Sequence, residues 1–133
     1  MINKEKKIAV FCGSSRGRNK IYTEAALTVA DFFIANGITM VNGGGSIGLM
    51  GIMADRISQN GGKSIGVIPL HLKDLEVAHK DMDEMIVTYD MAGRMKVIVE
   101  ISDAFITLPG GFGTMDELFE VLTLSQVNVQ INP

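Results

Sequence analysis

The sequence contains a single cysteine, Cys12, and no tryptophan. One cysteine excludes an intrachain disulfide and disfavours a zinc cluster. A lone thiol in an apolar strand fits a reducing compartment, so we expect a cytoplasmic protein. The two histidines, His71 and His79, have neither metal-ligand spacing nor a cysteine partner, and no metal site is expected.

An excess of charge and a long apolar run are also missing. The net charge is −3 at pH 7, which gives no electrostatic reason to expect a nucleic-acid or membrane partner. No apolar run is long enough to cross a bilayer, and none of signal-peptide length follows the charged residues 1–7. The 133 residues are 47% hydrophobic and 20% charged, as expected for one globular domain over residues 1–133 without linker or repeat.

Short apolar runs alternate with stretches of helical periodicity. Strands are expected at 8–12, 38–41, 64–68, 85–88 and 104–108, and helices at 21–34, 49–59, 91–101 and 114–127. Such apolar strands are typical of parallel sheets covered on both faces. The alternation favours right-handed crossovers, hence an α/β fold, a Rossmann-like three-layer sandwich with a parallel sheet. Residues 70–84 lack a clear period and are interpreted as a mobile or partly helical connection near the site.

Fifteen glycines cluster where strands give way to helices. In parallel sheets ligands bind beyond the carboxyl ends of the strands, so three glycine-rich loops are expected to line one site. The first carries Gly13 and Ser14, and the second carries Gly44 and Gly45. The second loop also fits a bare dinucleotide pattern, but the acid expected after the next strand is absent. Close backbone packing around a neighbouring ligand explains it equally well.

The third loop carries the strongest motif. It reads Pro109-Gly110-Gly111-Phe112-Gly113-Thr114-Met115-Asp116-Glu117. Its glycines let backbone N–H groups approach an anion, and the following helix points its positive dipole end at the same place. Thr114 can cap that helix or donate its hydroxyl to a phosphate oxygen. A plain strand-to-helix turn with a threonine cap is the structural alternative.

Two charged residues are candidates for chemistry. Glu117, in the first turn of the last expected helix, either stabilises that helix or places a carboxylate beside a bound sugar where positive charge develops. Arg94 is expected in the first turn of the helix at 91–101, at the carboxyl edge of the sheet. It is either a solvated helix residue or a ligand for a phosphate or carboxylate.

These motifs together resemble the "lonely guy" (LOG) family of cytokinin riboside 5′-monophosphate phosphoribohydrolases, often labelled lysine decarboxylases. The resemblance rests on the motif at 109–117, on Val10 to Ser15, on the glycines at 43–45 with Gly48 to Gly51, and on Asp103 to Ile106. It covers essentially the whole chain. No lysine has the phosphate-cupping context that pyridoxal-phosphate chemistry requires, which argues against the decarboxylase label.

The resemblance implies hydrolysis of the N-glycosidic bond of purine nucleoside 5′-monophosphates, cytokinin-type or AMP, without a cofactor. Glu117 and Arg94 match the family's catalytic residues. The segment from Gly110 to Asp116 would hold phosphate and ribose, and Glu76 and Thr123 align with substrate contacts. A homodimer is implied as well. A non-catalytic nucleotide-binding module is the alternative.

Two departures from the family pattern accompany the resemblance. Met95 stands where members commonly have a lysine after the arginine, and Lys96 comes one place later. One residue turns a helix by about 100°, so we do not expect Lys96 to replace that charge. Members also continue beyond the position of Pro133, and the fold is therefore expected without the family's C-terminal strand and helix.

Overall fold

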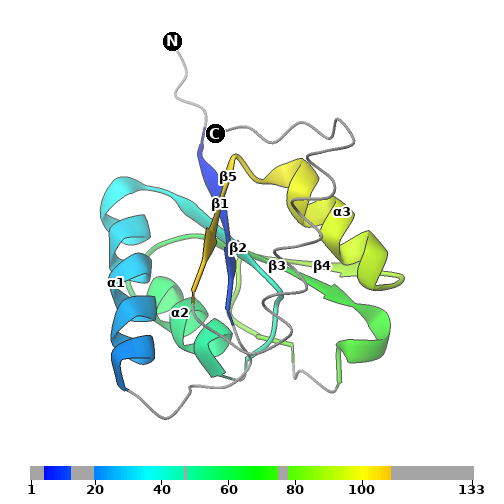
Figure 1. The fold of residues 1–133 in the computed structure, drawn as a ribbon, viewed down its shortest axis with the longest axis horizontal. Coiled ribbons are helices and arrows are strands. Elements are labelled where there is room, and N and C mark those ends of the chain that lie inside the picture. Colours follow the sequence, from blue (N-terminus) through cyan, green and yellow to red (C-terminus); the bar gives the residue numbers. More distant parts are fainter. Residues whose placement is uncertain (1–4, 13–19, 47, 75–77, 109–133) are drawn as a thin grey trace.

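The computed structural model describes residues 5–12, 20–46, 48–74 and 78–108 (Figure 1). The elements in this part of the chain are β1 (Lys7–Phe11), α1 (Lys20–Asn36), β2 (Thr39–Asn42), α2 (Gly48–Gln59), β3 (Ser64–Pro69), the 3-10 helix η1 (Leu70–Leu72), β4 (Glu84–Thr88), α3 (Met91–Ile101) and β5 (Ala104–Thr107). The predicted strands and helices up to residue 108 are confirmed, with ends that shift by one or two residues. The helix expected at 114–127 lies outside the described residues.

The five strands in the described part of the chain form one parallel sheet in the order β4-β3-β2-β1-β5. The chain moves outward from β1 to β4 and then returns through α3 to place β5 on the other side of β1. Because parallel crossovers are right-handed, helices of the outward path and the return path cover opposite faces. The direction of the chain therefore reverses between β1 and β5, where such folds place their ligand crevice.

The helices form the two outer layers of the sandwich. Figure 1 shows α1 and α2 together on one side of the sheet and α3 on the other. Alternate residues of each strand serve the two faces, as the pleat requires. Val10 and Met40 pack in the core under α1 and α2, whereas Phe11 and Val41 pack in the core under α3. The inner strands β1 and β2 therefore have two buried faces, and the predicted α/β class is confirmed.

Local signals explain where the helices begin and end. Asp90 caps α3, because its Oδ1 accepts a hydrogen bond of 2.8 Å from the Gly93 amide. Gly37 follows α1 with a φ of +64°, a left-handed conformation that suits glycine, and it confirms the predicted helix stop. Among the described residues, no helix combines the length and the apolar character needed to cross a bilayer.

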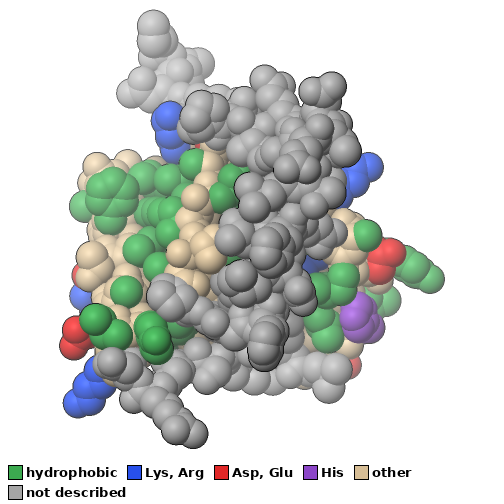
Figure 2. Space-filling view, in the orientation of Figure 1, with side chains coloured by type: hydrophobic (Ala, Val, Ile, Leu, Met, Phe, Trp, Pro, Cys, Tyr) green, Lys and Arg blue, Asp and Glu red, His purple; other side chains and the backbone are tan. Residues whose placement is uncertain are grey.

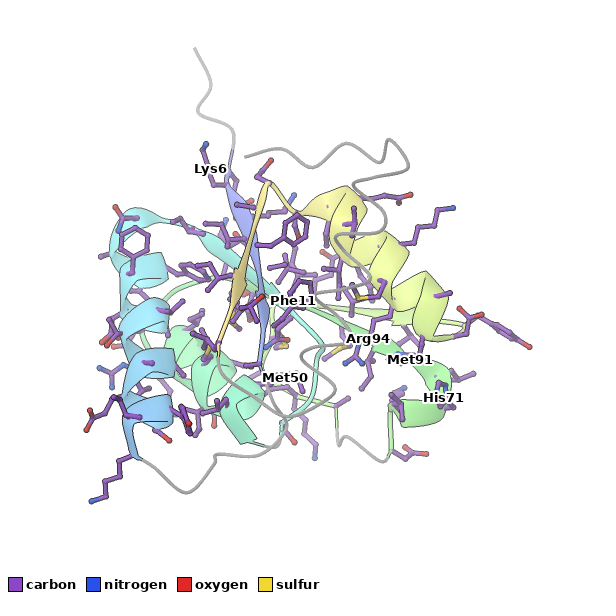
Figure 3. The ribbon with its side chains drawn as sticks, viewed as in Figure 1. Lys6, Phe11, Met50, His71, Met91 and Arg94 are labelled. Atoms are coloured by element: carbon purple, nitrogen blue, oxygen red, sulfur yellow. The ribbon has the colours of Figure 1, made fainter. Side chains whose placement is uncertain are left out.

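The connection between β3 and β4 is partly helical, as predicted. Pro69 is the last residue of β3 and is paired with Thr88. The 3-10 helix η1 follows at once, and His71 within it is exposed on the surface (Figure 3). Farther along, Ala78 forms an isolated antiparallel bridge with Gly45. The connection thus returns across the loop that follows β2, so that residues 33 positions apart become neighbours at the carboxyl edge of the sheet.

Candidate functional site

The described part of the site lies at the carboxyl edge of the sheet. Lys6 marks the amino edge in Figure 3, and Met50 and Arg94 lie toward the opposite edge. Two elements bring residues there: the loop after β2 and the start of α3. We call residues 43–46, which follow β2, the glycine turn.

Arg94 is held in the first turn of α3 and is buried. Its amide donates a hydrogen bond of 3.1 Å to the carbonyl of Asp90, the residue that caps the helix. The residue is only 4% exposed, which is uncommon for arginine. The prediction that Arg94 lies in the first turn at this edge is confirmed. Its burial excludes the alternative of a solvated helix residue.

The guanidinium of Arg94 bridges the ends of two strands. Nε donates to the carbonyl oxygen of Val67 in β3 at 2.9 Å, and Nη2 donates to that of Gly43 after β2 at 2.6 Å. Nη1 lies 3.8 Å from the sulfur of Met91, and Figure 3 shows these two side chains next to each other. A planar guanidinium with two fixed donors cannot rotate freely. Arg94 is therefore preorganised at the edge of the sheet.

Gly43 makes room for the guanidinium. A Cβ atom at this position would overlap Nη2 of Arg94 and lie 3.0 Å from the sulfur of Met50. The guanidinium therefore occupies the space that any side chain at 43 would fill. Here the glycine is required by close approach rather than by backbone conformation.

Gly44 is fixed through its amide. It has a φ of +79°, and its N–H donates a hydrogen bond of 2.8 Å to Oδ1 of Asn42, the last residue of β2. Asn42 is 2% exposed, and its Nδ2 has no hydrogen-bond partner among the described residues. Since Oδ1 must accept from Gly44, Nδ2 is assigned as the remaining donor. Sequence reasoning missed Asn42, although an Asn before a glycine run is a known signal for an Asx-type turn.

The rest of the glycine turn packs closely against neighbouring backbone. Gly66 in β3 lies beside Gly44, and a Cβ on Gly66 would come within 2.8 Å of the Gly44 Cα atom. In α2, a Cβ on Gly51 would overlap the Ser46 carbonyl. The helix begins at Gly48, directly after the turn. The second glycine loop therefore folds tightly between β2, β3 and α2. That this close packing surrounds a ligand stays a prediction.

Most of the other predicted site residues lie outside the described residues. These are Gly13, Ser14, Glu76, Gly110, Gly111, Phe112, Gly113, Thr114, Met115, Asp116, Glu117 and Thr123. Of the predicted site, the structure brings together Arg94, Gly44 and Gly45. The catalytic role of Glu117 and the phosphate-binding role of the third loop stay predictions.

The environment of Met95, which stands where the family commonly has a lysine, is apolar. Its side chain is 1% exposed and packs in the core under α3 with Val41 and Ile98. Lys96, the next residue, is exposed. Arg94 and Met95 thus leave α3 in different directions, one toward the carboxyl edge and one into the core. Lys96 is exposed whereas Met95 is buried, which agrees with the expected turn of about 100° between them; that Lys96 does not replace a charge at position 95 stays a prediction.

The ion pair between Arg56 and Asp31 lies away from this site. On the outer surface of α1 and α2, Arg56 donates to Asp31 with an Nε–Oδ1 distance of 2.8 Å. The hydrogen bond to Arg56 lowers the pKa of the Asp31 carboxyl. Arg56 belongs to the last turn of α2, at the opposite end of that helix from the glycine turn. We therefore assign this pair to the surface and not to the site.

Comparison with known proteins decides the family. The model of the family described as "Possible lysine decarboxylase" matches residues 50–133. The chain belongs to this family. Its curated relatives include the cytokinin riboside 5′-monophosphate phosphoribohydrolase LOG5 of Arabidopsis thaliana, with 40% identity over 96% of this chain and 56% of that protein. The probable phosphoribohydrolase LOG6 of the same plant is 44% identical over 96% of this chain and 64% of that protein.

A rice relative gives the same result. The probable phosphoribohydrolase LOGL2 of Oryza sativa subsp. japonica is 41% identical over 96% of this chain and 52% of that protein. The resemblance to the LOG family predicted from the motifs is thus confirmed. The chain spans only somewhat more than half the length of the curated relatives it matches.

Solved structures with the same fold are more distant. The molybdenum cofactor binding protein of Rippkaea orientalis has a TM-score of 0.76 and 22% identity, over 92% of this chain and 73% of that one. The Moco carrier protein of Chlamydomonas reinhardtii has a TM-score of 0.76 and 21% identity, with the same coverage. At this level of identity the likeness shows the fold alone.

Proposed function

We propose that this protein hydrolyses the N-glycosidic bond of purine nucleoside 5′-monophosphates. Water adds to C1′ of the ribose, the bond from C1′ to the base nitrogen breaks, and the base leaves with a proton. The products are free base and ribose 5-phosphate. The observation that carries the proposal is Arg94, a buried guanidinium fixed across two strand ends beside the glycine turn. The names of the curated relatives support the same reaction.

Each group has a role in this proposal that follows from its chemistry. The leaving of the base builds positive charge on the ribose, which a carboxylate stabilises. We assign that role to Glu117. Arg94 carries a permanent positive charge and presents donors in a fixed direction, which suits a phosphate or the carboxylate that faces the sugar. The glycine-rich loops then bind the phosphate and ribose through backbone N–H groups.

The family's description as a possible lysine decarboxylase names a rival activity, which four of the described lysines do not support. Lys63, Lys73, Lys80 and Lys96 are all exposed. A lysine that forms a Schiff base with pyridoxal phosphate needs a pocket that holds the cofactor's phosphate. An assay with lysine and pyridoxal phosphate should therefore release no carbon dioxide above the background without protein.

The decisive test of the proposal is release of free base. The protein is incubated with AMP and, separately, with an N6-substituted adenosine monophosphate, and the products are separated by chromatography. We expect free base and ribose 5-phosphate in equal amounts. Folded protein that gives no base with either nucleotide would refute the proposed hydrolysis. Stabilisation by AMP in a thermal-shift assay without base release would instead support a non-catalytic nucleotide-binding module.

The role of Glu117 is tested separately by Glu117→Gln. The amide keeps the size of the side chain but carries no negative charge. We expect the rate of base release to fall by roughly 10²-fold or more, because the developing positive charge loses its partner. Binding of AMP should change little. A variant as active as the original protein would remove Glu117 from the mechanism.

We also propose that the protein forms a homodimer. Several large apolar side chains are exposed: Ile21 and Phe32 on α1 are 57% and 56% exposed, and Tyr89 before α3 is 88% exposed. Figure 2 shows hydrophobic side chains at the surface on the side of α1. Exposed apolar surface is typical of protein–protein interfaces, and a second copy of the chain would bury it. Light scattering coupled to gel filtration should give twice the mass of one chain, and a monomeric mass would contradict the proposal.

A cytoplasmic location is the last part of the proposal. Cys12, the sole cysteine, is buried at the end of β1. A fold that keeps its thiol inside the core fits a reducing compartment. Fractionation of the source cells should find the protein with cytoplasmic markers, and recovery with any other fraction would overturn this assignment.

A further inference from the structure

A buried histidine, His79, holds one side of the glycine turn. His79 lies between η1 and β4, and its side chain is 4% exposed. Its backbone N–H donates a hydrogen bond of 2.8 Å to the Gly44 carbonyl oxygen. Ala78, the residue before it, pairs with Gly45 in an antiparallel bridge. Residues 78 and 79 therefore lie along one side of the turn.

The imidazole ring of His79 uses both of its nitrogens. Nδ1 accepts a hydrogen bond of 3.1 Å from the Asp81 amide, and Nε2 lies 2.6 Å from Oδ1 of Asp55 in α2. A backbone amide can only donate, so Nδ1 is the acceptor and the proton of the neutral ring is on Nε2. Nε2 then donates to the Asp55 carboxylate. The partners of the ring assign its tautomer.

These contacts make His79 a link between three elements. The ring joins α2 to the segment before β4, and the backbone of the same residue holds the turn. Both ring nitrogens are already engaged, so the histidine has a holding role and not a proton-transfer role. The link runs from Asp55 through His79 to Gly44, and the sequence separates the two ends of the histidine–aspartate contact by 24 residues.

The link matters because Gly44 is otherwise free to change conformation. Its φ of +79° lies in a region where glycine backbone rotates at little cost. Asn42 holds its N–H and His79 holds its C=O, so both of its polar groups are fixed. In a planar trans peptide the N–H of the next residue points opposite to the C=O. The bond from His79 to Gly44 therefore sets the direction of the Gly45 N–H.

We propose that His79 is a positioning residue of the nucleotide site. It holds the glycine turn so that the backbone N–H of Gly45 faces an oxygen of the bound nucleoside monophosphate. This inference rests on the proposed function for its ligand, and on the hydrogen bonds of His79 for its mechanism. Asp55 acts in the same link by fixing the ring from α2.

The test compares two substitutions at His79 with a control substitution at His71. His79→Leu removes both ring hydrogen bonds and keeps apolar bulk. His79→Gln places an amide N–H near the position of Nε2 and retains the bond to Asp55. His71→Leu, the same change at the exposed histidine of η1, is the matched control. Each variant is examined by hydrogen exchange of the peptide over 42–50, without ligand, and by kcat and KM for base release from AMP.

We expect His79→Leu to speed exchange in 42–50 and to raise KM by roughly tenfold, with kcat changed by less than about threefold. The split follows because a turn that binds substrate and transition state alike contributes to KM and not to kcat. His79→Gln should bring KM back to within about threefold of the original protein. The control His71→Leu should leave exchange and KM unchanged.

The outcomes separate this inference from the proposed function. If the original protein releases base and His79→Leu has the same KM, then His79 does not position the site, even if the variant melts at a lower temperature. If His79→Leu does not fold, His79→Gln decides: the original KM supports the link to Asp55, and a raised KM contradicts it. If the original protein releases no base, the proposed function fails. Exchange in 42–50 then still decides whether His79 holds the turn.

Discussion

Arg94 and Gly43 form one structural unit, in which Nη2 of Arg94 donates a hydrogen bond of 2.6 Å to the Gly43 carbonyl oxygen. The two residues are 51 positions apart in the chain and come from α3 and the end of β2. The guanidinium fits there because position 43 has no side chain. Neither residue can be exchanged without consequences for the other, and this dependence leads to the first two predictions.

Arg94→Lys should lower kcat/KM for base release from AMP by roughly 10²-fold. Lysine keeps the charge but has a single ammonium group, which cannot contact Val67 and Gly43 in the same way as the planar fork. Steady-state kinetics check the expectation. Arg56→Lys, on the outer surface of α2, is the control and should retain full activity. Full activity in Arg94→Lys would show that a point charge is sufficient.

Gly43→Ala should lower activity through Arg94, because the added methyl group overlaps the guanidinium and displaces it. We expect a loss of roughly tenfold or more in kcat/KM together with a lower melting temperature. Gly37→Ala separates the two effects. Position 37 has open space for a methyl group, but its φ of +64° is strained for alanine. This substitution should therefore lower the free energy of unfolding by about 1 kcal/mol and leave KM unchanged. Equal kinetics for both variants would contradict the steric argument.

Met95→Lys should destabilise the protein and not improve its activity. The side chain of Met95 is 1% exposed in the core under α3, so lysine would bury an unpaired charge there. The expected loss is about 3 kcal/mol or more in the free energy of unfolding. Met95→Leu should cost less than about 1.5 kcal/mol. Denaturant titrations check both values, and a stable Met95→Lys variant would mean that position 95 turns out of the core.

Asp31→Asn should lower the melting temperature slightly at neutral pH and not in acid. The Asp31 carboxyl has its pKa lowered below 3.8 by the hydrogen bond to Arg56, so the folded state binds this proton less readily than the unfolded state. The stabilisation is present above pH 3.8 and is lost as the pH falls through the lower folded pKa. The melting temperatures of variant and original protein should therefore differ at neutral pH and converge in acid.

Salt provides the control for that prediction. Both partners are exposed on the surface, so ions in solution screen their attraction. The difference in melting temperature between Asp31→Asn and the original protein should shrink in 1 M salt. A difference that persists in acid and in salt would mean that Asp31 acts through packing and not through charge.

Local signals were sufficient to predict most of the fold. The apolar run before Gly13 predicted β1, because a strand buried on both faces leaves a continuous apolar run in the sequence. The stretch from Met91 to Ile101 predicted α3, because a helix buried on one face leaves a helical period. Asn36 and Gly37 predicted the end of α1 for the same local reason. The connection at 70–84 was harder, since η1 is too short to leave a period.

The site was predictable only in part. Arg94 and the glycines at 44 and 45 were found because their residue types and their places after strands are visible in the chain. Asn42 and His79 were missed. The partners of His79 are Asp55 and Gly44, and nothing in the neighbouring sequence of any of the three indicates the others.

The sequence by itself determined the helices and strands up to residue 108, the parallel class of the sheet and the edge at which the glycine turn lies. These follow from periodicity, strand composition and the rule that crossovers are right-handed, all of which act over short stretches or on connectivity alone. The tertiary structure alone decided that Arg94 binds the carbonyls of Val67 and Gly43, and that His79 holds Gly44. Such contacts depend on sheet register and on how helices and loops pack, which join residues far apart in the chain and therefore leave no local pattern.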